Sequence, residues 1–198
     1  MSSQTEFKPL SNEARHELNR ISEKILNGTP HADIEPIDQI GCGVGRCVAT
    51  TNHTPDGTIV KFALPTEELS LTDGIVQNAV EKHISNAASI LNGYTLPLLD
   101  SQKGENPEWL CYPRATTECG ITDIYRAWDE LEEHGFNSSD FFADTNWGSW
   151  NDQPYLVDFG YAHPDNDCRS TTIASAVDIW KEISKKTATN TKTMESTD

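Results

Sequence analysis

The sequence is most informative at DFFADTNWGSWNDQPYLVDFGYA, residues 140–162. An apolar run at 155–157 ends at Asp158, and Asn146 lies upstream of that run. A buried strand that ends in Asp158 should present this carboxylate to a cleft, because the residues before it fill the core. Carboxylate and amide oxygens are hard ligands of the kind that Mg²⁺ prefers in proteins. The stretch therefore predicts a magnesium site made by Asn146 and Asp158.

The length and composition of the chain bound its architecture. With 198 residues and 36% hydrophobic side chains, the chain fits one domain or two small lobes around a cleft. No apolar run reaches membrane-spanning length, and the N-terminal MSSQTEFKPLSNEARHEL lacks the apolar core of a signal peptide. A soluble, cytoplasmic protein without a membrane partner is expected.

The chain is strongly acidic, with 31 acidic and 15 basic residues and a net charge of −16. Such a field repels phosphate backbones, so no nucleic-acid partner is expected. The acidic residues are spread along the whole chain, which suits a halophilic host whose salt screens their repulsion, although composition alone leaves the host open. Five cysteines without a C-x-x-C pair indicate neither a zinc site nor a disulfide framework, so reduced thiols are expected.

Apolar spacing and turn residues predict the order of the elements. SNEARHELNRISEKILNG should form a helix with Ser11 as N-cap and Gly28 as C-cap. PIDQIGCGVGRCVATT should form two strands joined by a glycine-rich turn, and TIVKFAL a third strand. A second helix is expected in LTDGIVQNAVEKHISNAASILNG, capped by Thr72 or Asp73. YTLPLLD and EWLCYP should be two further strands, and ITDIYRAWDELEEHGF a third helix.

This order predicts an α+β fold, in which a five-stranded antiparallel sheet with one inserted helix precedes a shorter helical part. Residues 1–33 are expected to be an N-terminal extension that carries the first helix, and residues 34–115 the lobe that contains the sheet. Residues 116–186 should form a truncated helical lobe that ends in an amphipathic helix at 170–186. The polar segment 187–198 is expected to be a disordered tail.

Gly41, Gly43 and Gly45 lie in the turn between the first two expected strands. A Walker A loop would end in Gly-Lys-Ser/Thr, and a dinucleotide fingerprint would open a helix, but this sequence does neither. A glycine-rich hairpin that closes over phosphates through backbone N–H groups fits the context, and an ordinary hairpin without a ligand is the alternative. Arg46, directly after the turn, either contacts a phosphate or points to solvent.

Lys61 lies between apolar neighbours on the third expected strand. Strand alternation places Lys61 on one face with Ile59, while Val60 and Phe62 lie on the other. An unpaired buried charge is costly, so an acid on the following helix should pair with Lys61, and Glu81 is the best placed. The alternative is an edge-strand lysine that reaches water.

The chain resembles the protein kinase-like superfamily in the order and spacing of its motifs, which are Gly41-Cys42-Gly43, Lys61, Glu81, Asn146 and Asp158-Phe159-Gly160. It is also similar to the very short kinase-like proteins of tailed viruses of bacteria and archaea. The resemblance covers residues 34–162. It implies binding of ATP and Mg²⁺, with Lys61 on the phosphates and with Val48 and Ile59 over the adenine. It also implies a host cytoplasm or a virion as the location.

Two departures from the kinase pattern bear on catalysis. Phe141 stands where the resemblance places the proton-accepting Asp, so Asp140 and Asp144 are the remaining candidates for that role. Little chain follows Gly160, and no Ala-Pro-Glu segment is present. One hypothesis is therefore a slow ATP- and magnesium-dependent phosphotransferase. A second is a pseudokinase, a nucleotide-binding regulator that engages a protein partner, and a third is a structural protein of a virion or of host interaction.

Overall fold

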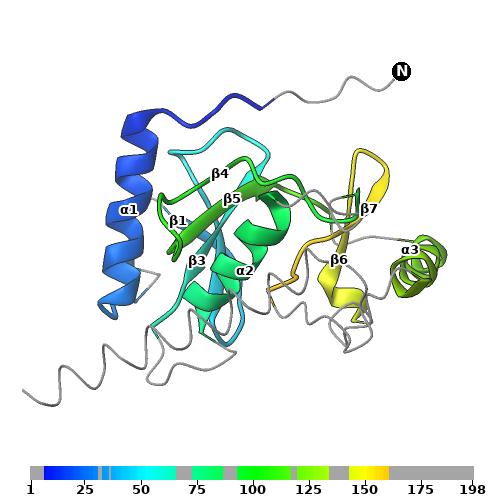
Figure 1. The fold of residues 1–198 in the computed structure, drawn as a ribbon. Helices are drawn as coiled ribbons and strands as arrows, with labels where there is room; N and C mark the ends of the chain where they lie inside the picture. The colour runs from blue at the N-terminus through cyan, green and yellow to red at the C-terminus, as the bar shows by residue number, and fades with distance from the viewer. Residues whose placement is uncertain are drawn as a thin grey trace, which may run out of the picture.

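The computed structural model describes residues 7–30, 33–35, 37–65, 73–86, 93–116, 120–133 and 143–160. Within these residues the chain forms an antiparallel five-stranded sheet, a two-stranded hairpin and α-helices, so the expected α+β class is confirmed (Figure 1). The larger sheet has the order β1-β2-β3-β5-β4, with bounds Ile37–Cys42, Arg46–Thr51, Thr58–Ala63, Trp109–Pro113 and Asp100–Ser101 in that order. The other elements are α1 (Asn12–Leu26), α2 (Gly74–Asn86), α3 (Ile121–Glu133), a 3-10 turn (Asp144–Asn146), β6 (Trp147–Trp150) and β7 (Gln153–Leu156).

Helix α1 begins and ends where local capping groups satisfy its backbone. The Ser11 hydroxyl accepts a hydrogen bond from the Ala14 N–H at 3.1 Å, which confirms Ser11 as the N-cap. At the other end the C-cap is Asn27 rather than the expected Gly28, which follows it with φ 80°. Gly28 N–H donates to the Ile25 carbonyl at 2.9 Å, a closure that favours glycine because the left-handed region is strained for other residues.

One face of the five-stranded sheet packs against α1. Leu18, Ile21 and Ile25 form a buried cluster with Val60 and Phe62, and all of these side chains are at most 2% exposed. Figure 1 shows α1 lying along this side of the sheet. Helix α1 therefore shares a core with the sheet. The N-terminal segment that carries α1, expected to be an extension, covers one face of the sheet.

The opposite face of the sheet packs against α2. The Asp73 carboxylate accepts hydrogen bonds from Ile75 N–H at 2.8 Å and Val76 N–H at 3.1 Å, so Asp73 caps the helix. Val80 and Ile84 enter a second buried cluster that contains the sheet residues Ile59, Leu110 and Tyr112, and the hairpin residues Trp147 and Leu156. This cluster joins the sheet to the hairpin.

Two strand predictions need correction. The segment YTLPLLD, residues 94–100, is expected to be a strand, but β4 comprises only Asp100–Ser101, since Pro97 lacks the N–H that a ladder requires. Residues 147–150, which are not among the expected strands, form β6 and pair with β7. Asn151 and Asp152, with φ 52° and 61°, make the tight two-residue turn between β6 and β7, a conformation that Asn and Asp tolerate.

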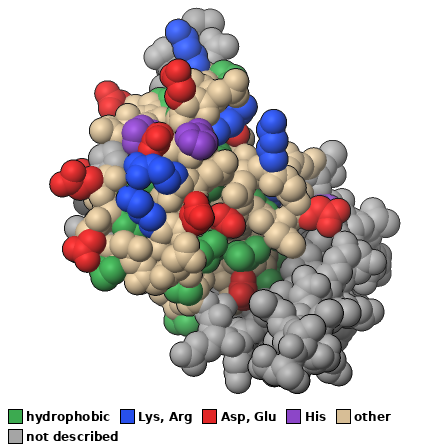
Figure 2. Space-filling model, turned by 90° about the vertical axis from the view of Figure 1, so that its left-hand side faces the viewer, with side chains coloured by type: hydrophobic (Ala, Val, Ile, Leu, Met, Phe, Trp, Pro, Cys, Tyr) green, Lys and Arg blue, Asp and Glu red, His purple; other side chains and the backbone are tan. Residues whose placement is uncertain are grey.

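Some expectations lie outside the described residues, namely the helix at 170–186 and the tail at 187–198. None of the described helices has the length and apolarity that a bilayer crossing requires. On the face that α1 covers, acidic side chains are interspersed with basic ones and with histidines rather than gathered in one patch (Figure 2). Cys42, Cys47 and Cys111 are free thiols, as expected, while Cys119 and Cys168 lie outside the described residues.

Candidate functional site

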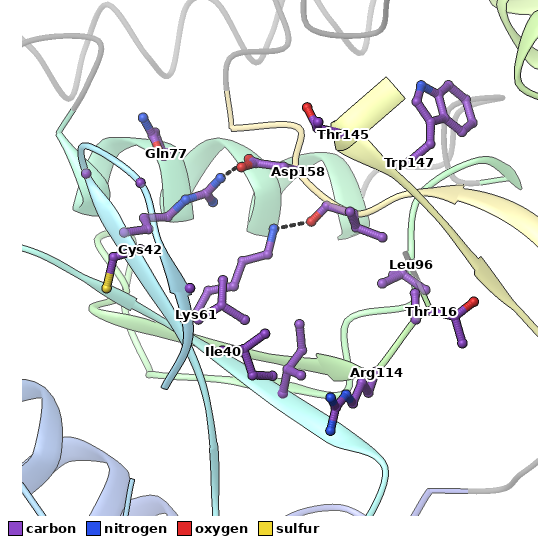
Figure 3. A pocket seen from close by; sticks show the side chains of 18 of the residues that line it. Ile40, Cys42, Lys61, Gln77, Leu96, Arg114, Thr116, Thr145, Trp147 and Asp158 are labelled. Atoms are coloured by element: carbon purple, nitrogen blue, oxygen red, sulfur yellow. Dashed lines mark hydrogen bonds and ion pairs between the residues drawn. The ribbon is translucent and has the colours of Figure 1, made fainter. Parts of the chain in front are cut away.

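A cavity of about 1320 Å³ lies between the five-stranded sheet and the β6–β7 hairpin. Its walls come from the turn between β1 and β2, from β3, from the first turns of α2, from the segment after β5 and from both ends of the hairpin. Gln77, Lys61 and Asp158 lie toward one end of the cavity, and Leu96 and Thr116 lie toward the other (Figure 3). The site thus brings together residues that are far apart in the sequence.

The glycine-rich turn forms one wall of this cavity, and Gly41, Gly43 and Gly45 all line it. Gly43 N–H donates to the Arg46 carbonyl at 2.8 Å, which closes the turn. A Cβ atom at Gly41 would meet nothing within 4 Å, and neither Gly41 nor Gly43 has a positive φ. Glycine is therefore not required here for the backbone conformation, and its effect is to leave the backbone open to a ligand.

Lys61 and Glu81 form a buried ion pair behind this turn. Lys61 Nζ donates to Glu81 Oε1 at 2.8 Å and to Oε2 at 2.9 Å, and it also donates to the Val157 carbonyl. The pairing expected from the sequence is present, and the edge-strand alternative is excluded because Lys61 is 3% exposed in the middle of the sheet. Burial lowers the pKa of Lys61, and Glu81 acts in the opposite direction.

Arg46 is buried beside this pair, so the expectation that it could point to solvent is wrong. Its side chain is 5% exposed, Nη1 lies 2.8 Å from Glu81 Oε1, and Nη2 contacts Asp158 Oδ1. Burial opposes the charge of the guanidinium, but Glu81 and Asp158 outweigh burial and raise the pKa of Arg46. The signal that could have placed Arg46 is strand alternation, because Arg46 is two residues before Val48 and shares its face.

Glu81 connects the sheet to the segment that follows β7. Its Oε1 also accepts a hydrogen bond from Phe159 N–H at 3.1 Å, so one carboxylate engages Lys61, Arg46 and the backbone of the Asp-Phe-Gly tripeptide. Gly160 allows this approach, since a Cβ atom there would lie 2.7 Å from Gln77 Cβ. The sequence predicts the pairing of Glu81 with Lys61, but it gives no signal for the contacts of Glu81 with Arg46 and with Phe159 N–H.

Asp158 lies at the cavity with about half of its side chain exposed (51%). Burial acts to raise the pKa of this carboxyl, but the charges of Arg46 and Lys61 outweigh burial and hold the pKa below its usual value. The carboxylate is therefore ionised and already faces a guanidinium.

The backbone of Asn146 lies next to the residue before Asp158. The Asn146 carbonyl accepts a hydrogen bond from Val157 N–H at 2.8 Å. Its neighbours Thr145 and Trp147 line the cavity. Among the residues that the structure describes, no group of three or more His, Cys, Asp or Glu side chains could hold a metal ion. Arg46 engages Asp158, so a metal ion at this carboxylate would compete with the guanidinium, and the magnesium site at Asn146 and Asp158 stays a prediction.

The two candidate proton acceptors are not placed. Asp140 lies outside the described residues. Asp144 opens the 3-10 turn, but its side chain is outside the described part of the chain. The assignment of a catalytic base to either residue stays a prediction.

The far end of the cavity offers apolar surface. Val48 and Ile59 line the cavity from the sheet, and Leu96 and Trp147 add to its apolar lining; the position of Val48 and Ile59 over an adenine stays a prediction. Arg114, which is exposed, stands among the polar residues at this end. A cavity with apolar lining and with two cations, each paired with a carboxylate, can take a ligand with a flat ring system and an anionic group. No model of a known protein family matches this chain, and no curated protein matches it.

Proposed function

We propose that this chain is a kinase-like nucleotide-binding protein whose cavity takes ATP. The observation that carries the proposal is the buried Lys61–Glu81 pair, which lies behind a glycine-rich turn in a cavity of about 1320 Å³. A lysine held by a glutamate on the helix inserted after its strand is the arrangement by which kinase-like proteins engage α- and β-phosphates.

The proposed pose of ATP follows from the residues that line the two ends of the cavity. The adenine ring lies between Val48 and Ile59 on the sheet side and the apolar residues opposite, because a flat ring gains most from apolar contact on both faces. The phosphates lie against the backbone of Gly41 and Gly43, where the glycines leave open space. Lys61 reaches the phosphates from the floor of the cavity, and Glu81 orients it.

Two activities compete within this proposal. A slow phosphotransferase would place Mg²⁺ at Asn146 and Asp158, and it would need Arg46 to leave Asp158 first. A pseudokinase would bind the nucleotide without turnover and would present the liganded form to a protein partner. The contact of Arg46 with Asp158 favours the pseudokinase, because it engages the carboxylate that a metal-dependent enzyme would use.

A thermal unfolding titration with ATP tests nucleotide binding. At 100 times the dissociation constant, ATP should stabilise the wild type by about 2.7 kcal/mol. Lys61→Met should lose most of this increment, because it removes the charge that engages the phosphates. Lys82→Met is the matched control, since Lys82 is on α2 but bonds the carbonyls of Gln102 and Gly104, away from the cavity. An increment of zero for the wild type would refute the proposal.

Turnover separates the two activities. ATP hydrolysis and autophosphorylation are measured on the wild type and on Asp158→Asn at equal nucleotide occupancy. Turnover that Asp158→Asn abolishes identifies a phosphotransferase, whereas binding without turnover in either protein identifies a pseudokinase.

A further inference from the structure

We propose that the cavity binds its nucleotide without a divalent cation, and that the guanidinium of Arg46 takes the place that a metal ion would hold at Asp158. The inference rests on the nucleotide binding proposed above and names the form of the ligand, a nucleoside polyphosphate that carries no metal. It assigns Arg46 as a phosphate-binding residue beside Lys61.

The first support is that Asp158 already has a cation. Arg46 Nη2 contacts Asp158 Oδ1, and Nη1 lies 2.8 Å from Glu81 Oε1. A metal ion at Asp158 would have to displace the guanidinium, which is 5% exposed, and would leave it with Glu81 alone. Such a displacement would separate the buried guanidinium from one of its two anionic partners, which is unfavourable. The chain is also shaped around the arginine, since a Cβ atom at Gly160 would lie 3.0 Å from Arg46 Nη2.

The second support is the position of Arg46. Its side chain lines the cavity next to the glycine-rich turn, and a guanidinium fork matches the oxygens of a phosphate. Nη1 is held by Glu81 Oε1 at 2.8 Å, so a phosphate would engage the guanidinium on the side where it meets Asp158.

The third support is the balance of charge at this end of the cavity. Arg46 and Lys61 together offset Glu81 and Asp158. Without Arg46 the remaining three groups would carry a net negative charge, and a polyphosphate would need an added cation to approach them. The arginine supplies that positive charge from the chain itself.

Isothermal titration of the full chain with ATP, once in excess EDTA and once in Mg²⁺, tests the proposal. The wild type should bind in EDTA with a dissociation constant within about threefold of its value in Mg²⁺. Binding only in Mg²⁺ would overturn the metal-free inference and leave the proposed nucleotide binding intact. Absence of binding in both buffers would refute the nucleotide binding itself, so the two failures are distinguishable.

Variants of Arg46 test whether its guanidinium is responsible for binding in EDTA. Arg46→Gln should weaken binding in EDTA by about tenfold or more, and Mg²⁺ should restore part of the loss because Asp158 is then free. The affinity of Arg46→Lys in EDTA should lie between those of the wild type and Arg46→Gln. Lysine keeps the positive charge but lacks the planar guanidinium that can bind two oxygens. Arg126→Gln is the matched control, because Arg126 is exposed on α3 and pairs only with Asp123 among the contacts described. Arg46→Gln that binds in EDTA like the wild type would overturn the proposal.

Asp158→Asn gives an independent readout that does not depend on the folding of an Arg46 variant. It removes the candidate metal ligand and leaves Arg46 paired with Glu81. Binding in EDTA should tighten severalfold, because a negative charge that faces the phosphates is lost and the guanidinium is freed. A site that depends on metal would instead lose affinity in Mg²⁺, and that result would contradict the assignment of Arg46.

Discussion

Neighbouring residues of β3 point into two different environments. Val60 and Phe62, each 0% exposed, face α1 and lie in a cluster made of apolar side chains. Ile59 and Lys61, 8% and 3% exposed, face the cavity and α2. The two faces of one strand are therefore similarly buried, but one is apolar and the other carries charge.

This difference indicates what each face does. Burial of apolar surface stabilises the fold, and the α1 face gains from it without a desolvation cost for charge. On the cavity face, Lys61, Arg46 and Glu81 are desolvated, and their mutual attraction offsets a cost that apolar residues would not have. Well-packed apolar residues at these positions would serve stability as well or better, so stability alone does not account for the charges.

The largest expected effect is on the apolar face. Phe62→Ala should lower the free energy of unfolding by about 3–5 kcal/mol, because it removes a fully buried ring and leaves a cavity. Chemical denaturation measures the loss, and the dissociation constant for ATP, where the variant is folded, should stay near the wild-type value. Phe62→Leu, which keeps most of the volume, is the control. A loss in Phe62→Ala no greater than in Phe62→Leu would break the comparison between the faces.

Glu81→Gln should have the next largest effect. It should lower the free energy of unfolding by an amount toward the lower end of about 3–5 kcal/mol, because the charges of Lys61 and Arg46 lose their shared partner. Glutamine keeps one acceptor oxygen for Phe159 N–H, which limits the loss. Denaturation and ATP titration on the same samples should show that stability and affinity fall together. Glu17→Gln changes a partly exposed Glu on α1 that pairs with Arg20, and it should leave both stability and affinity unchanged. A Glu81→Gln protein as stable as the wild type would show that the pair is not needed.

Parts of this arrangement were predictable because they follow from periodicity and from the cost of burial. Alternation in TIVKFAL assigned Val60 and Phe62 to one face and Lys61 to the other, and the structure has that arrangement. A buried lysine requires an acid, and helical spacing left Glu81 as the best candidate. The sheet with its inserted helix followed from the same local signals.

Other parts depend on contacts between distant segments. Strand alternation gives the face of β2 on which Arg46 lies, but its partner Asp158 is 112 residues away in the sequence, and no local signal identifies that contact. The β6–β7 hairpin did have a local signal, the Asn151-Asp152 turn, but the residues before that turn lack a clear alternation of apolar and polar side chains. The relation between Asn146 and Asp158 depends on this hairpin and could not be derived without it.

A smaller effect is expected at the start of α1. Ser11→Ala should lower the free energy of unfolding by about 1 kcal/mol, because the Ala14 N–H loses its acceptor. Ser11→Asp keeps an acceptor oxygen and should retain wild-type stability. ATP affinity should be the same in all three proteins, since α1 covers the face away from the cavity. A change in affinity in Ser11→Ala would show that the two faces are coupled, and the separation between them would then have to be revised.

The smallest effect expected is the pH dependence that Asp158 contributes on the cavity face. Its pKa is held below the usual value because Arg46 and Lys61 outweigh burial, so the ionised carboxylate stabilises the folded state above the unfolded pKa of about 4. This contribution is lost as the pH falls through the folded pKa, where the carboxylate takes up a proton. About half of the side chain is exposed, so solvent screening keeps the contribution below about 1 kcal/mol. The difference in unfolding free energy between the wild type and Asp158→Asn should therefore shrink as the pH falls from 6 to 2, since groups common to both proteins cancel. A difference that grows on acidification would mean that Asp158 is not held by Arg46 in solution.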